Sequence, residues 1–450
     1  MTAQDLVAAR QLIGDNHPAA VPGTDPQFEA ALNGGYSSAT RLAEKVRSYE
    51  GYRAVLQRYA AGFGDRHISS RALLDSPQRW PGFMVAMGED WRVTSSVGKD
   101  APKPGSQLVS CDGVAPPQLA ESRLRPTMSN WNIAAQRKRN SYRLLLDDAD
   151  PFVTLPKRCV FADDAGNRSE YELDWKTISA SDLNTHMRVA VGRPNADVSV
   201  TALADGWWVR LGTLVDDARP IVEEVARRSA ELRAGRFVVV DLRGNGGGSS
   251  VYAERIAETL YGEQRTASVL KRIAAGPEAV TWRASTGNLE TLDQYVERFS
   301  RELGPDDRLV PLLKQFRVAV AEALRDGAAV ATVPVESENK KKQNKVRGAP
   351  PSVVLFTDRF CFSSCLMATH LFRGLGALHV GEETDQNTHY TEVRSLTLPS
   401  GLSTFSTLQA IARSHARLVG PFTPTIVYSG RTDDDAAVKA WVREHVSSSR

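Results

Sequence analysis

Three consecutive glycines follow an apolar run near the middle of the chain, in the segment Val238-Val-Val-Asp-Leu-Arg-Gly-Asn-Gly-Gly-Gly-Ser-Ser250. Glycine lets the backbone turn sharply and lets another group approach the N–H groups closely. A dinucleotide-binding fingerprint requires a glycine where Ser249 stands, and a phosphate-binding P-loop requires a lysine that is absent here. Two interpretations remain: a backbone oxyanion hole for charge developing on a carbonyl oxygen, or a tight turn with no chemical role.

A pair of serines about 115 residues later is the second chemical signal, in Phe356-Thr-Asp-Arg-Phe-Cys-Phe-Ser-Ser-Cys-Leu-Met367. Ser363 stands just before an expected helix, where the helix N-terminus favours an attacking alkoxide and an oxyanion. The plain alternative is that Ser363 or Ser364 only caps the helix. The chain contains no Gly-x-Ser-x-Gly motif, so an α/β-hydrolase site is not supported.

Both loops lie at the junction of a buried strand and a helix in a βαβ-type alternation. The strands are expected at 237–241 and 352–356, and the helices that follow them at 250–261 and 364–373. Before this region, residues 3–62 follow a helical pattern, and 79–125 contain short strand-like runs separated by Pro and Gly. Further helices are expected at 126–146, 218–233, 288–303 and 307–327, and further strands at 377–381, 389–398 and 403–411.

The composition of the 450 residues is that of a globular protein, with 42% hydrophobic and 24% charged residues. Fifty-six basic and 53 acidic residues leave a charge of +3, which gives no reason to expect nucleic acid or an anionic membrane as the main partner. No apolar run approaches the ~18 residues of a membrane span. Met1–Val7 shows no signal-peptide pattern, so the protein is cytoplasmic, or exported or periplasmic if a signal was removed.

Together the two loops resemble the C-terminal processing and tricorn-like serine peptidases. The likeness rests on Asp241-Leu-Arg-Gly-Asn-Gly-Gly-Gly248, Cys361-Phe-Ser-Ser-Cys365 and Val380-Gly-Glu-Glu-Thr384, in that order. It is thinner nearer the N-terminus, where Phe63-Gly-Asp-Arg-His67 resembles the family's Asp-x-His segment and 104–113 resembles part of its PDZ-like module. The resemblance implies a Clp-protease/crotonase-type α/β core. It also implies Ser363 as nucleophile and the N–H groups of Gly246, Gly247 and Ser364 as the oxyanion hole.

The general base separates two branches of this family. The C-terminal processing enzymes use a lysine in a Gly-Glu-x-Thr-x-Gly-Lys run, and Asn387 occupies that position here and cannot serve as a base. The tricorn-like branch uses an N-terminal histidine, which His67 matches, and a histidine can take the serine proton and return it to the leaving amine. The alternative is that His67 is an ordinary surface-loop histidine. His389 is the competing base near Asn387.

The acid that orients the histidine is not identified by the sequence. The segment 417–424, where the resemblance places a glutamate, contains no acid. Four carboxylates are possible substitutes: Asp65, Glu382, Glu383 and Glu392. Cys361 and Cys365 either form a disulfide across the serine turn or remain free buried thiols. The sequence gives no indication that Cys111 and Cys159 form a disulfide with each other.

We therefore expect an α/β protein in four parts: an N-terminal helical region with His67 (1–75), a PDZ-like β module (76–125), a connecting α+β segment (126–200), and an α/β catalytic core (201–450) with a mobile loop at 336–347. The expected function is that of a serine endopeptidase acting on peptides or unfolded proteins, without cofactor or metal. The histidines show no zinc-binding spacing. The alternatives are a catalytically inactive relative that binds a peptide or apolar ligand in the same site, and a crotonase-like acyl-CoA enzyme. The oligomeric state is not predicted.

Overall fold

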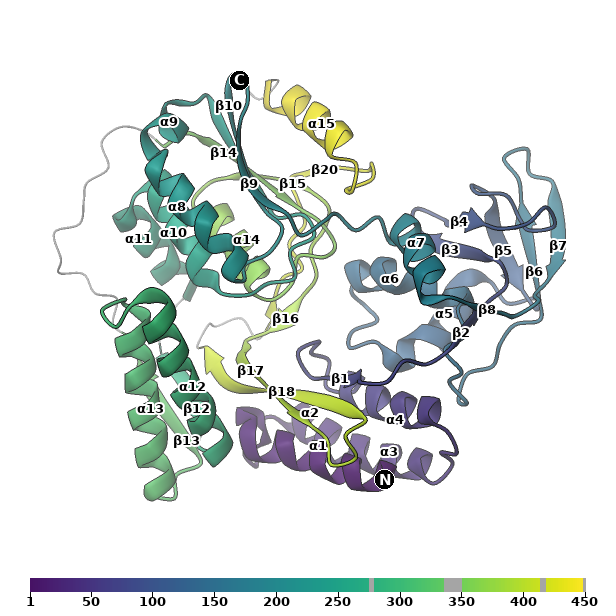
Figure 1. Ribbon diagram of the computed structural model, residues 1–450, viewed down its shortest axis with the longest axis horizontal. Coiled ribbons are helices and arrows are strands. Elements are labelled where there is room, and N and C mark those ends of the chain that lie inside the picture. Colours follow the sequence, from purple (N-terminus) through teal and green to yellow (C-terminus); the bar gives the residue numbers. More distant parts are fainter. Residues whose placement is uncertain (275–278, 336–349, 413–417, 448–450) are drawn as a thin grey trace.

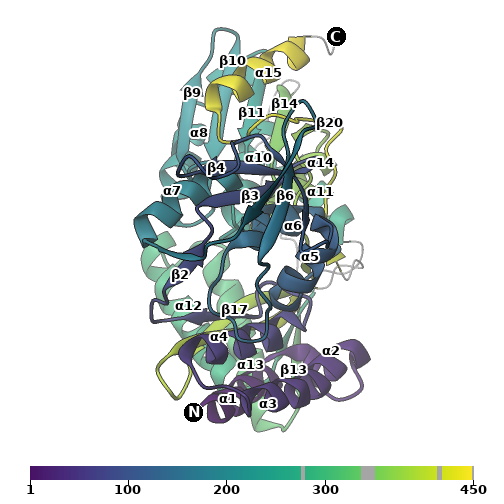
Figure 2. The same ribbon diagram turned by 90° about the vertical axis from the view of Figure 1, so that its right-hand side faces the viewer.

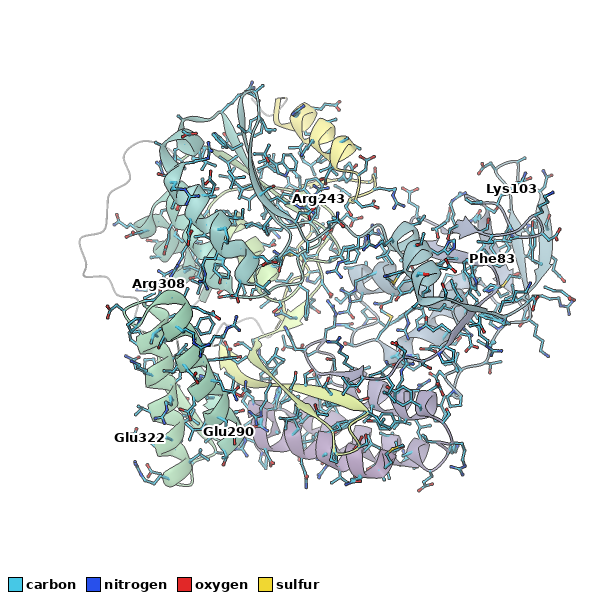
Figure 3. The ribbon with its side chains drawn as sticks, in the orientation of Figure 1. Phe83, Lys103, Arg243, Glu290, Arg308 and Glu322 are labelled. Carbon is cyan, nitrogen blue, oxygen red and sulfur yellow. A yellow bond between two sulfur atoms is a disulfide. The ribbon has the colours of Figure 1, made fainter. Side chains whose placement is uncertain are left out.

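The structure, a computed structural model, describes residues 1–274, 279–335, 350–412 and 418–447. Figure 1 shows an α/β core, a base formed by the N-terminal helices, and a separate β module beside the core. A pair of long helices, α12 (Thr286–Leu303) and α13 (Leu309–Arg325), stands next to the base; Glu290 and Glu322 mark them in Figure 3. The loop expected at 336–347 lies outside the described residues.

The core is built on a six-stranded sheet in the order β20-β15-β14-β11-β10-β9. All neighbours pair in parallel except β9, which is antiparallel to β10. Every residue of β11 is buried, which explains its uninterrupted apolar run. The strands are β9 (Val198–Ala202), β10 (Gly206–Leu211), β11 (Phe237–Asp241), β14 (Ser352–Thr357), β15 (Leu378–Gly381) and β20 (Ile426–Val427).

Helices cover both faces of this sheet, as the α/β alternation predicts (Figure 1). Those on one face are α8 (Arg219–Arg227), α9 (Ser229–Ala234), α10 (Ser250–Tyr261), α11 (Glu263–Ala274) and α14 (Ser364–Gly374). On the other face α15 (Asp435–Ser447) packs Val438 and Val442 against Trp208 and Phe356. The predicted helices at 250–261 and 364–373 are confirmed, and α11 and α15 were not predicted.

A buried charge cluster fixes the end of β11. Asp241 accepts hydrogen bonds from Arg210 and Arg243, and Arg243 also donates to Thr432 and Asp435 beside α15. Burial alone opposes ionisation, but the charges of the two arginines lower the pKa of Asp241 below its usual value. Arg243 lies inside the core in Figure 3. The Asp-Leu-Arg part of the glycine-loop motif therefore anchors the loop.

The N-terminal helices form one core with strands from the opposite end of the chain. The helices are α1 (Thr2–Asn16), α2 (Pro26–Ala30), α3 (Tyr36–Ala43) and α4 (Tyr49–Ala61). The sheet against them contains β1 (Ser69–Ala72), β12 (Ala279–Arg283), β13 (Val330–Pro334), β17 (Tyr390–Thr397) and β18 (Ser403–Ala412). Val55 and Leu56 of α4 belong to one buried cluster with Phe405 and Leu408 of β18. Consequently strands that follow the glycine loop in the sequence pack against the N-terminal helices.

The β module is a five-stranded antiparallel sheet that extends beyond the boundary expected at residue 125. Its strands are β3 (Phe83–Met87), β4 (Trp91–Ser96), β5 (Gln107–Cys111), β6 (Arg158–Ala162) and β7 (Arg168–Glu172). It carries α5 (Pro116–Leu124), α6 (Ala134–Asn140) and α7 (Ala180–Val191). A disulfide between Cys111 and Cys159 joins β5 to β6. Figure 2 shows this module in front of the core, and Phe83 and Lys103 mark it in Figure 3.

Two short strand pairs complete the fold: β2 (Gln78–Trp80) with β8 (Lys176–Ile178), and β16 (Asn387–Thr388) with β19 (Leu418–Val419). None of the described helices combines the length and apolar character that crossing a membrane requires.

Candidate active site

Ser363 stands at the turn between β14 and α14 in an unusual backbone conformation. Its φ of 57° and ψ of −128° lie where residues other than glycine are rare, and such a conformation persists only when its surroundings hold it. One restraint is local, since Cys361 and Cys365 on either side of the serine form a disulfide. Of the two states left open by the sequence for these cysteines, the disulfide is the one found.

The glycine loop lies directly against this turn. A Cβ atom added to Gly247 would lie 2.7 Å from Cβ of Ser363, and one added to Gly248 would lie 2.1 Å from the carbonyl oxygen of Leu214. Because both distances are far below van der Waals contact, only glycine at 247 allows the close approach to the serine turn, and only glycine at 248 allows the close approach to the backbone of Leu214. The hydroxyl of Ser364 donates to the carbonyl of Gly248 at 2.6 Å and ties the loops together.

His67 approaches Ser363 from the N-terminal base. Its Nε2 lies 3.0 Å from Oγ of Ser363, and its ring packs on that of Phe362 with 4.5 Å between centroids. The residue directly precedes Ile68 and β1, whose pairing with β18 holds this segment, and the Ser406 hydroxyl donates to the His67 carbonyl at 2.7 Å. Two residues that are 296 positions apart in the sequence are thus joined by one hydrogen bond.

Asp65 is the carboxylate that contacts His67. Its Oδ1 lies 2.8 Å from Nδ1 of His67 and also accepts the backbone N–H of His67, while the Thr388 hydroxyl donates to Oδ2. Burial opposes ionisation of this carboxyl, but the hydrogen bonds and charge of His67, with Thr388, lower its pKa to about 2. An ionised Asp65 favours the proton on Nδ1, which leaves Nε2 free to accept the proton of Ser363.

The other three candidate acids have different partners. Glu382 forms an ion pair with Arg359 at 3.2 Å, and Glu383 accepts the Thr423 hydroxyl at 3.1 Å. Glu392 is partly buried beside Tyr295, and desolvation raises its pKa. The competing base His389 packs on Tyr390 with 4.4 Å between ring centroids. Asn387, at the position of the lysine in the other branch, pairs with Val419 in a short ladder.

The predicted oxyanion donors divide into two groups. The N–H of Gly247 donates to Oδ1 of Asn245 at 2.8 Å and is therefore already satisfied within the loop. The amide of Asn245 is itself oriented, because its Nδ2 donates to the Leu211 carbonyl at 2.7 Å. For the N–H groups of Gly246 and Ser364, no acceptor is found in the part of the chain that the structure describes.

A buried carboxyl accepts hydrogen bonds from the backbone of both the glycine loop and the serine turn. Asp358, at the end of β14, accepts the N–H groups of Gly244 at 2.9 Å and Phe360 at 3.0 Å. Burial, together with the charge of Glu382, raises the pKa of Asp358 to about 7. Asp358 was not among the residues predicted from the sequence, although an aspartate directly after a buried strand and within the serine motif is a recognisable signal. No cluster of metal-ligating side chains occurs among the described residues.

Comparison with known proteins gives a structural match. No family model and no curated protein matches the sequence. The structure superposes on mature CPAF complexed with lactacystin with a TM-score of 0.66 at 15% identity, covering 99% of this chain and 98% of that one. Mature CPAF alone gives a TM-score of 0.63 at 15% identity, with 100% and 98% covered, and a CPAF mutant gives 0.63 at 13% identity, with 99% and 98% covered.

These matches span nearly the whole of both chains, so this protein has the fold of CPAF throughout. The predicted fold class, an α/β chain with a Clp-protease/crotonase-type core, an N-terminal helical segment and a PDZ-like β module, is confirmed. Structures of a photosystem II D1 C-terminal processing protease and of the tricorn protease also match, at 12% and 10% identity. Their TM-scores of 0.33 and 0.38 add nothing to the fold assignment.

Proposed function

We propose that this chain is a serine endopeptidase in which Ser363 is the nucleophile and His67 the general base. The observation that carries the proposal is the hydrogen-bonded series from Ser363 through His67 to Asp65, with distances of 3.0 Å and 2.8 Å. Its three members come from two segments far apart in the chain, and a serine in contact with a histidine that a buried carboxylate orients is the arrangement that activates a hydroxyl.

In this mechanism His67 Nε2 takes the hydroxyl proton as Ser363 Oγ attacks the peptide carbonyl carbon. The N–H groups of Gly246 and Ser364 stabilise the resulting oxyanion. His67 then delivers the proton to the leaving amine, the C–N bond breaks, and an acyl-enzyme remains on Ser363. Water deprotonated by His67 hydrolyses this ester and regenerates the serine. Peptides and unfolded proteins are the proposed substrates.

A peptide-binding protein without turnover is the second candidate, and one observation favours it. The N–H of Gly247 is held by Asn245, so one of the three predicted oxyanion donors is withdrawn from the site. Removing one such donor from a serine hydrolase costs about 10²- to 10³-fold in kcat.

Labelling with a fluorophosphonate probe, followed by peptide mass spectrometry, tests the proposal on the wild type, Ser363→Ala and His67→Ala. We expect an adduct on Ser363 that is lost in both variants, together with cleavage of unfolded casein by the wild type alone. Ser268→Ala, which removes an exposed hydroxyl of α11, is the matched control and keeps the adduct. A wild type that binds casein but forms no adduct and no fragments contradicts the peptidase and favours the second candidate.

A further inference from the structure

Three arginines converge on the two loops of the candidate site. Arg66, next to His67, lies with its guanidinium carbon 4.0 Å from the centre of the Phe362 ring. Arg193 lies over the Phe360 ring at 5.3 Å and donates to the Gly244 carbonyl at 3.3 Å. The third, Arg139, comes from α6 of the β module.

A single carboxylate, that of Asp385, serves two of these arginines. Its Oδ2 accepts hydrogen bonds from both Arg66 and Arg139, the latter at 3.0 Å. Its Oδ1 accepts the side-chain amide of Gln136 at 2.9 Å and the N–H of Gln386 at 2.8 Å. Asp385 is completely buried, and both of its oxygens are engaged. It has no remaining capacity to neutralise a third guanidinium.

Other acids near the loops are also engaged. Asp65 is bonded to His67, Glu382 is paired with Arg359, and Asp358 accepts backbone N–H groups. Within the described residues no acid forms an ion pair with Arg193, whose side chain is exposed. With a neutral His67, three arginines against the carboxylates of Asp385 and Asp65 leave one uncompensated positive charge near Ser363.

Burial and the neighbouring arginines both act on the pKa of Arg139. Burial, and then the neighbouring charge of Arg66, lower its pKa to about 10, and Arg193 acts in the same direction. Asp385 offsets only part of this effect. Because Arg66 and Arg139 are largely shielded from water, their charges add to the attraction of Arg193 for a carboxylate more than exposed arginines would.

We propose that Arg193, supported by the charges of Arg66 and Arg139, binds the carboxylate side chain of an aspartate or glutamate in the substrate, close to the bond that is cleaved. The inference rests on the proposed function, since it names the class of peptide that the site prefers. Arg193 contacts Gly244, two residues before the oxyanion donor Gly246, and Arg66 adjoins the base. A residue of an extended peptide spans about 3.3 Å, so the recognised side chain belongs within a few residues of the cleaved bond.

Matched peptides test this preference. Each internally quenched peptide carries glutamate or glutamine at one position on either side of the cleaved bond, with an amidated C-terminus. For the wild type at low salt we expect kcat/KM to favour glutamate about 10-fold at one or two positions, as for a charge-assisted hydrogen bond. In Arg193→Gln the preference falls to about 2-fold or less. Arg227→Gln, an exposed arginine of α8 paired with Glu224, is the control and keeps the preference.

Several results would overturn the inference: equal cleavage of glutamate and glutamine peptides by the wild type, an unchanged preference in Arg193→Gln, or a preference that follows a free C-terminal carboxylate instead of the side chain. Binding of the same peptides to Ser363→Ala, measured by fluorescence anisotropy, separates this inference from the proposed function. Tighter binding of glutamate peptides that is lost in Ser363→Ala/Arg193→Gln supports the charge recognition even if no hydrolysis occurs. Absent cleavage and labelling contradict only the peptidase.

Discussion

Asp65 and His67 are held together twice, because Oδ1 of Asp65 lies 2.8 Å from Nδ1 of the imidazole and 2.8 Å from the backbone nitrogen of the same residue. The proposed acid and base therefore belong to one turn and form a unit. What brings this unit to Ser363 lies outside the turn: β18 through Ser406, and the 385–388 segment through Thr388 and Asp385.

Replacement of the acid tests this unit. We expect Asp65→Asn to lower kcat/KM about 10⁴-fold, because an asparagine amide can donate to Nδ1 and thereby stabilise the tautomer whose Nε2 carries the proton. Asp65→Ala, which imposes no tautomer, should retain more activity than Asp65→Asn. Hydrolysis rates over pH 5 to 9, with circular dichroism as a check on folding, provide the measurement. Full activity of Asp65→Asn would exclude this carboxylate as the orienting acid.

The contact between the glycine loop and the serine turn leads to a prediction with a control in the adjacent residue. Gly247→Ala places a Cβ 2.7 Å from Cβ of Ser363 at a φ of 107°, so we expect loss of activity and of about 2 kcal/mol or more of stability. Gly246→Ala meets nothing within 4 Å, and its stability should stay within about 0.5 kcal/mol of the wild type. Urea unfolding of both variants checks this. Equal destabilisation would show that the close approach is not what selects glycine.

The two disulfides are expected to act on different properties. Cys111 and Cys159 close a loop of 48 residues, and replacing both with serine should cost about 4 kcal/mol of stability in the chain-entropy estimate. Cys361 and Cys365 are only four positions apart, for which the same estimate gives about 2 kcal/mol, but they flank Ser363. Their replacement should therefore lower kcat more than KM is raised. Thermal unfolding and steady-state kinetics distinguish the pairs, and a purely thermal effect of both would contradict this division.

Sequence reasoning was most successful where the chemistry is local. The glycine loop and the serine turn each follow a buried strand, and the apolar runs at 237–241 and 352–356 predicted both strand-to-helix junctions. The parallel pairing of β11 with β14 brings these junctions to the same end of the sheet. Asp65 remained one of four candidates, although an aspartate whose side chain accepts the N–H two residues later is a common turn pattern. That pattern supplies a local signal for the acid beside His67.

Features that depend on tertiary pairing could not be predicted. The bond between Cys111 and Cys159 follows from the pairing of β5 with β6, which are separated by helices that the sequence did not connect to this sheet. Likewise Asn245 accepts the N–H of Gly247 because its side-chain amide is oriented by the hydrogen bond that it donates to the Leu211 carbonyl. In both cases the residue that determines the arrangement lies far away in the sequence, and its amino-acid type gives no chemical signal.

Acid stability should depend on His17, a completely buried histidine in the N-terminal base. Its ring stacks on Phe28 at 4.1 Å between centroids, and its Nδ1 accepts the Ala19 N–H at 3.1 Å. Burial lowers its pKa to about 3, despite the opposing charges of Asp65 and Asp25. Between pH 6.5 and about 3 the unfolded chain therefore binds a proton that the folded chain does not, and stability falls as the pH falls.

The expected contribution of this histidine is about 1.4 kcal/mol per pH unit below pH 6.5, fully regained above it. His17→Phe removes the titrating group and should flatten this part of the stability curve, at the cost of the Ala19 hydrogen bond at every pH. Denaturant unfolding of both proteins at pH 7.5, 6, 5 and 4 measures the difference. Since the other carboxylates and histidines are common to both chains, parallel curves would mean that His17 is protonated without cost and that its burial does not govern the acid sensitivity of the base.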